Sequence, residues 1–169
     1  PKAPSDDALY VVTRDESVPP DGEPHEIALE TPYDGLHWLE VTSGGDRATV
    51  SFADARPFTL VCDSYFPGTP WSLYFYVPKG TKVVGGYAGD TGGVMLDGSG
   101  KTVFTFQTLG KPGHFKVAVP PGQDAALWKL QACRGVRRLM TVPPCLAPSP
   151  DELLLPEEVV KADAKARKQ

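Results

Sequence analysis

Apolar and polar residues alternate with a period of two almost without interruption from residue 8 to residue 142, and this pattern constrains the fold most. Such alternation is typical of strands that bury one face, whereas an amphipathic helix repeats every 3.6 residues. Gly and Pro separate the runs: 17 Gly and 18 Pro make 35 of the 169 residues, a density that leaves few places for a helix. The body of the chain is therefore expected to be all-β.

The alternation predicts about a dozen short strands with turn signals about every ten residues. These strands cover residues 8–14, 25–30, 36–42, 47–54, 57–63, 71–77, 82–88, 93–97, 101–107, 114–119, 126–133 and 136–142. Many short strands favour a two-sheet antiparallel β-sandwich or jelly roll over a parallel sheet, because a parallel sheet would need crossover helices.

The same pattern identifies the residues expected between the two sheets. Ala48, Val50 and Phe52 alternate with polar neighbours and are expected to face inward. The larger core side chains are expected to be Phe52, Phe75, Phe104, Phe106, Phe115 and Trp128. Residues 97–100, Asp-Gly-Ser-Gly, predict a hairpin turn.

The character of the chain changes after Val142, where prolines stiffen an extended stretch. We expect a β-sandwich domain over residues 1–147 and a C-terminal extension over residues 148–169. A short helical turn is predicted from Ser149, because Pro at the first helical position and acidic residues in the first turn favour a helix start. Residues 153–155, three leucines, are expected to pack back on the body, ahead of a charged tail.

Charge and hydropathy exclude two classes of partner. The net charge of −4 argues against a nucleic-acid-binding surface, and no apolar run approaches the roughly 18 residues of a membrane span. Cys62, Cys133 and Cys145 lack the C-x-x-C spacing of a zinc or redox site. They are either three buried small side chains or one disulfide and one free thiol.

The segment 71–77 presents the clearest candidate binding surface. Its apolar residues share one face suited to the core, which places Tyr74 and Tyr76 side by side on the other face. A pair of tyrosines can stack on the C–H face of a sugar, with hydroxyl groups available for hydrogen bonds. The same pair could instead pack under a loop or against residues 153–155.

Trp38 is the tryptophan expected to be exposed, because its strand face also carries Glu40 and other polar residues. Glu40 thereby becomes the acid to consider for a glycan-active hydrolase or lyase. No second carboxyl group is evident beside it, and the G-x-S-x-G, H-E-x-x-H and phosphate-loop motifs are missing from the sequence. A non-catalytic domain is therefore predicted, without an organic cofactor.

Asp90 and Asp97 lie in sharp, glycine-containing turns and offer oxygen ligands. These turns could hold a structural calcium ion. Turn formation by Asp explains the same residues.

Two stretches resemble a known class of domain: Val77-Pro78-Lys79-Gly80-Thr81-Lys82, and Val119-Pro120-Pro121-Gly122-Gln123-Asp124 with the strand that follows. They are similar to non-catalytic β-sandwich modules, of the carbohydrate-binding type, attached to large secreted bacterial polysaccharide-processing proteins. The resemblance covers residues 71–156 and concerns the scaffold, so it transfers no site residue.

The resemblance implies a secreted or extracytoplasmic protein whose partner is a polysaccharide or oligosaccharide. With Trp38, Glu40, Tyr74 and Tyr76 as candidate ligand-binding residues, the leading hypothesis is a glycan-binding module. The alternatives are a structural module packed on neighbouring domains of a parent chain, and a small glycan-active enzyme that uses Glu40.

Overall fold

The computed structural model of the protein describes residues 12–33, 37–44, 48–53, 58–61 and 70–155, together with residues 159 and 163. The chain divides into two compact units, Pro1–Ser51 and Phe52–Gln169, which are described separately. This boundary lies within the stretch for which one domain, residues 1–147, was expected. Cys62 lies outside the described residues, and so do residues 8–11 of the expected strand 8–14.

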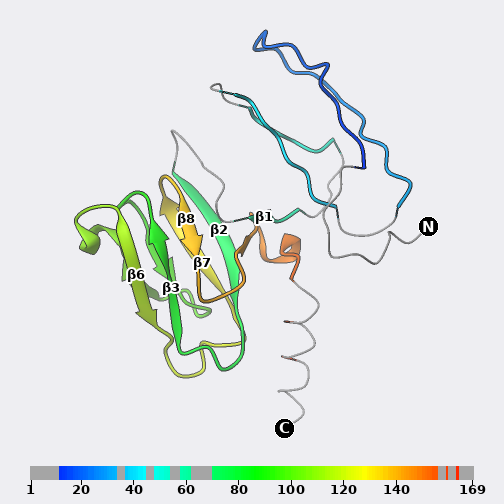
Figure 1. Ribbon diagram of the computed structural model, residues 1–169. Coiled ribbons are helices and arrows are strands. Elements are labelled where there is room, and N and C mark those ends of the chain that lie inside the picture. Colours follow the sequence, from blue (N-terminus) through cyan, green and yellow to red (C-terminus); the bar gives the residue numbers. More distant parts are fainter. Residues whose placement is uncertain are drawn as a thin grey trace. The chain divides into compact units, whose positions relative to one another are not determined.

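The named strands and short helices belong to the second unit (Figure 1). In chain order they are β1 (Leu60–Val61), β2 (Trp71–Val77), β3 (Val83–Ala88), β4 (Val94–Leu96), β5 (Thr102–Thr105), η1 (Phe106–Leu109), β6 (Gly113–Ala118), β7 (Ala126–Cys133), β8 (Arg137–Leu139), β9 (Cys145–Leu146) and η2 (Pro150–Glu152). Both η elements are short 3-10 helices. Within the described part of the chain, no helix is long and apolar enough to cross a membrane.

The strands form three sheets in which every pairing is antiparallel, and the all-β prediction is confirmed. The four-stranded sheet has the order β2-β7-β4-β5 and the three-stranded sheet the order β6-β3-β8. The two-residue strands β1 and β9 form the third, so the count differs from the two sheets expected. A bridge between Tyr74 and Ala147 brings the chain after β9 beside β2.

One hydrophobic cluster joins the inward side chains of the two larger sheets. Phe75 and Trp128 are fully buried from the four-stranded sheet, and their rings meet at 6.2 Å. Phe115, from β6, meets the Phe106 ring of η1 at 5.3 Å and the Phe104 ring of β5 at 6.0 Å. The five aromatic core residues predicted within β2–β7 are therefore confirmed as members of the cluster or as side chains packed against it.

The expected strands 25–30, 36–42 and 47–54 are wrong for the residues that the structure describes. Residues 12–33, 37–44 and 48–53 contain no strand. Ala48, Val50 and Phe52, which were expected in the core, are exposed, Phe52 by 43%. Alternation marks a segment that is able to pair, but it does not supply the neighbouring strand that would bury one face.

The predicted hairpin turn is confirmed between β4 and β5, where Asp97 N–H binds the Lys101 carbonyl at 2.9 Å. The predicted helical turn is η2. After it, the Leu154 N–H donates to Thr59 Oγ1 at 2.7 Å, and this hydroxyl donates to the Glu152 carbonyl at 3.3 Å. The start of the C-terminal extension is thus bonded to the segment just before β1.

Candidate functional site

Trp38 and Glu40 lie in the first unit, and both are exposed, Trp38 by 60%. Exposure of Trp38 agrees with the expectation, but the residues do not share a strand face, because residues 37–44 contain no strand. Tyr74 and Tyr76 belong to the second unit. Tyr74 and Tyr76 thus lie on one strand of the second unit, whereas Trp38 and Glu40 are exposed residues of the first unit.

The tyrosines of β2 are half-buried, and residues from later in the chain contact both. The Tyr74 backbone forms a pair of hydrogen bonds with Ala147, at 2.8 and 3.0 Å, and its ring lies 5.0 Å from Lys129 Nζ. The Tyr76 hydroxyl donates to the Asp163 carboxylate, whose other oxygen accepts the Lys79 N–H at 3.2 Å. These contacts favour a structural role for the β2 tyrosines, as in the alternative considered from the sequence.

The two aspartates considered for calcium are engaged within their own turns. One oxygen of buried Asp97 accepts hydrogen bonds from Ser99 N, Ser99 Oγ and Lys101 N, at 2.9, 2.6 and 3.0 Å. Burial raises the pKa of Asp97, but these hydrogen bonds outweigh it and the pKa lies below its usual value. Asp90 Oδ1 accepts the Gly92 N–H at 2.6 Å. In the described part of the chain, no three His, Cys, Asp or Glu side chains gather into a metal site.

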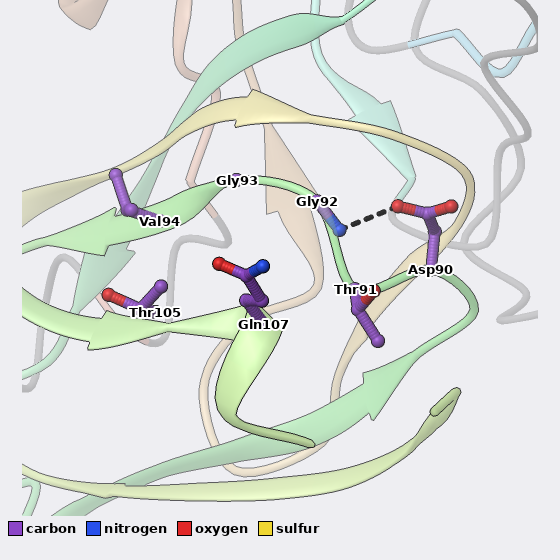
Figure 2. A pocket seen from close by; sticks show the side chains of 7 residues that line it. All are labelled: Asp90, Thr91, Gly92, Gly93, Val94, Thr105 and Gln107. Atoms are coloured by element: carbon purple, nitrogen blue, oxygen red, sulfur yellow. Dashed lines mark hydrogen bonds between the residues drawn. The ribbon is translucent and has the colours of Figure 1, made fainter. Parts of the chain in front are cut away.

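An open pocket of about 490 Å³ adjoins Asp90. Its walls come from the loop between β3 and β4, from the start of β4, from the end of β5 and from η1. Figure 2 shows the lining residues: Asp90, Thr91, Gly92, Gly93, Val94, Thr105 and Gln107. Asp90 is the one ionisable side chain among them, and none is aromatic. The pocket offers hydroxyl and amide groups for hydrogen bonds but no ring on which a sugar could stack.

A buried arginine holds the pocket loop in place. Arg137 is 1% exposed; Nη2 donates to the Gly92 carbonyl at 2.6 Å, and Nη1 to the carbonyls of Arg134 and Val136 at 2.7 and 3.0 Å. Its guanidinium lies 4.3 Å from the centre of the Phe106 ring. Burial lowers the pKa of Arg137, yet an arginine stays charged in proteins. Arg137 therefore joins the β3–β4 loop to the turn between β7 and β8.

The described cysteines are poor nucleophiles. Cys133 is fully buried beside Arg137, and burial raises the pKa of its thiol to about 11. Burial also raises the pKa of Cys145. Because a thiolate is the reactive form, neither residue is suited to covalent catalysis.

The three-stranded sheet carries a second aromatic surface, which the sequence analysis did not identify. Tyr87, on the central strand β3, is paired in register with His114 of β6 and Arg138 of β8. The Tyr87 and His114 rings meet edge to face at 5.4 Å. Two residues along β3, Gly85 is paired with Lys116, and its carbonyl accepts the Met140 N–H at 2.9 Å. We call the side of the sheet that bears Tyr87, His114, Lys116, Arg138 and Met140 the outer face.

The outer face is accessible on both sides of its central strand. His114, Lys116, Arg138 and Met140 are exposed, Met140 by 63%, and Tyr87 is half-buried. The opposite side of the same strands supplies Phe115, Val117 and Leu139 to the core. Alternation in each strand indicates which residues face outward, but only the pairing register, which the sequence does not reveal, aligns His114, Tyr87 and Arg138.

Comparison of the chain with protein-family models, curated proteins and solved structures gives no match.

Proposed function

We propose that the chain is a non-catalytic module that binds an oligosaccharide or polysaccharide, and that the outer face is the binding surface. The observation that carries the proposal is the row His114, Tyr87 and Arg138 across three paired strands. A tyrosine ring supplies an apolar surface for sugar C–H groups, and the neighbouring side chains supply donors for sugar hydroxyls. By the resemblance stated above, such a module works in a secreted or extracytoplasmic protein.

The rigidity of the strands supports this surface over the other candidates. The outer face is built on paired strands whose reverse side is packed in the core, so its backbone needs little ordering when a ligand binds. On β2, the Tyr76 hydroxyl is already bonded to Asp163, and Lys129 Nζ lies over the Tyr74 ring. Trp38 is more exposed but lies in a segment without a strand.

A binding role is also favoured over catalysis by the arrangement of acids. A glycosidase needs two carboxyl groups about 5 to 10 Å apart. The pocket supplies the single carboxyl group of Asp90, and β3, β6 and β8 carry no acidic residue. We expect no release of reducing ends or unsaturated products from a polysaccharide panel. Activity that disappears in Glu40→Gln, with folding intact, would contradict the proposal.

The decisive experiment is titration calorimetry of the full chain against a polysaccharide panel. For one small binding face we expect a dissociation constant of about 1 μM to 1 mM. Tyr87→Ala should weaken binding by about 1 kcal/mol or more, the value of a stacked ring. Tyr74→Ala and Trp38→Ala serve as matched aromatic truncations on the other candidate surfaces. If one of these abolishes binding while folded Tyr87→Ala retains full affinity, the outer face is not the site.

A second candidate, a structural module that packs on a neighbouring domain, is favoured by exposed apolar residues in the N-terminal part. Those exposed by about half include Ile27, Leu39, Val41 and Val50. Apolar side chains at this density on short segments are typical of a surface that another protein surface covers. Hydrogen exchange of this chain over residues 25–53 tests this: fast exchange throughout agrees with an apolar surface that a partner would cover, and strong protection in the chain alone contradicts it.

A further inference from the structure

The charge of the outer face restricts the kind of glycan it can bind. The whole chain carries a net charge of −4, but residues 70–155 contain nine Lys or Arg and five Asp or Glu, a net charge of +4. The strands of the outer face contribute Lys116 and Arg138 and no acidic residue. The acidic balance of the chain therefore arises elsewhere, and this sheet is locally basic.

The two cations of the outer face are available to a ligand. Neither Lys116 nor Arg138 forms an ion pair with a carboxylate of the described residues, where the ion pairs are Arg14 with Glu16 and His25 with Asp21. Both side chains are exposed. A cation that has no internal partner costs little to engage with an external anion, because no existing ion pair must be broken.

Lys116 and Arg138 are spaced so that one extended polymer chain can contact both. Lys116 lies beside Gly85 and Arg138 beside Tyr87, on opposite sides of the central strand. With strands about 4.8 Å apart and a rise of about 3.4 Å per residue, their Cα atoms lie about 12 Å apart, with Tyr87 between the two positions across the sheet. At this separation each cation can also pair with its own anionic group on a chain that carries such groups repeatedly.

The chemistry of the surface distinguishes an acidic glycan from a nucleic acid. A guanidinium binds a carboxylate or sulfate group through two parallel hydrogen bonds, and the Tyr87 ring accepts the apolar face of a sugar. Proteins that bind duplex DNA neutralise about 6 to 10 phosphates. The outer face supplies two cations, Lys116 and Arg138, which fall well short of that number.

We propose that the outer face binds an acidic polysaccharide, whose carboxylate or sulfate groups pair with Lys116 and Arg138 while a sugar ring stacks on Tyr87. This inference rests on the proposed glycan-binding function and adds the ligand class.

The test uses two matched pairs of probes: polygalacturonate against its methyl ester, and dextran sulfate against dextran. Calorimetry with the full chain should show at least about tenfold tighter binding of the acidic member of one or both pairs. Raising the salt concentration from 0.1 to 1 M shortens the screening length from about 10 to 3 Å and should weaken this binding, with a smaller effect on the neutral member.

The variant Lys116→Gln/Arg138→Gln should lose about tenfold or more in affinity for the acidic probe and little for the neutral one. The matched control is Lys101→Gln/Arg134→Gln, which removes one Lys and one Arg charge outside the outer face and should bind as the unmodified chain does. Circular dichroism and thermal melting check that both variants fold.

The possible results distinguish failure of the acidic-ligand inference from failure of the proposed glycan binding. If the neutral probes bind as tightly as the acidic ones, or both double variants lose equally, the acidic-ligand inference is overturned while glycan binding stands. If duplex DNA at equal charge concentration competes as well as the acidic glycan, the surface is a general polyanion binder and the inference is also overturned. If no probe binds and the panel under the proposed function is also negative, glycan binding itself fails.

Discussion

The substitution Gly93→Ala tests the packing beneath the pocket with a single methyl group. Gly93 has a φ of +94°, and an added Cβ would lie 2.7 Å from the Cα and Sγ atoms of Cys133 and from the Gln131 carbonyl oxygen. Two of these three atoms belong to the β7 backbone, which cannot rotate away as a flexible side chain would. Gly100, at the β4–β5 turn, offers a matched control, because its φ is +83° and no atom lies within 4 Å of its added Cβ.

The two substitutions separate backbone strain from steric overlap. A non-glycine residue at positive φ costs about 1 to 2 kcal/mol, and this cost is common to both sites. Overpacking against a fixed neighbour adds about 1 to 3 kcal/mol at Gly93 alone. Gly93→Ala should therefore lower the free energy of unfolding by about 2 to 5 kcal/mol, and Gly100→Ala by about 1 to 2 kcal/mol.

Urea unfolding of the full chain, followed by fluorescence, measures the difference. Trp128 is fully buried, so its emission reports the second unit. For both variants, the slope of the unfolding free energy against urea concentration should equal that of the unmodified chain. The midpoint urea concentration should fall, and more for Gly93→Ala than for Gly100→Ala. Equal losses at Gly93 and Gly100 would refute the close approach of the pocket loop to β7.

Three further predictions concern acids and thiols. The pKa of Asp97 is lowered in the folded state, so its stabilising contribution is complete above about pH 4 and is lost as the pH falls through the folded-state pKa. Asp97→Asn should cost about 1 to 3 kcal/mol at pH 6 and show a smaller decline in acid, as measured by urea unfolding from pH 6 to pH 2. The losses in unfolding free energy caused by Tyr76→Phe and Asp163→Asn should be non-additive, because the two side chains share a hydrogen bond. A double-mutant cycle should give a coupling of about 0.5 to 3 kcal/mol. Additive losses would contradict that bond. Iodoacetamide at pH 8 should label native Cys133 on the order of 100-fold more slowly than the unfolded chain, judged by mass spectrometry, because its pKa is about 11.

The sequence predicted those elements whose signals are local. Strands β2 and β7 have the predicted bounds, because each has apolar residues at every second position over most of its length and turn residues at its ends. The turn at Asp97 is marked by its own composition, since the Asp side chain accepts the backbone N–H groups that follow it. These features need no information about distant parts of the chain.

The remaining features depend on partners that the sequence does not name. Residues 48–53 alternate as well as β6 does, yet Phe52 is exposed and Phe115 is buried, because only β6 has a paired neighbour and a core to cover it. Arginine is usually exposed to solvent. Arg137 is nevertheless buried, because its guanidinium donates to three backbone carbonyls and lies over the Phe106 ring. The outer face depends on the register of three strands, two of which are separated by more than twenty residues from the central strand.

The pairing of β1 with β9 sets an order of events during synthesis. Leu60 and Leu146 are paired although they lie 86 positions apart, and Thr59 is bonded to Glu152 and Leu154. At a ribosomal rate of about 5 to 20 residues per second, β1 waits roughly 4 to 17 s for its partner to be made. During that interval the residues of β2 to β8 are synthesised, while Leu146, the residue paired with Leu60, has not yet been made. A ribosome stalled between residues 140 and 144 would therefore hold a chain with every strand of the two larger sheets synthesised and with β9, the strand that pairs with β1, not yet made.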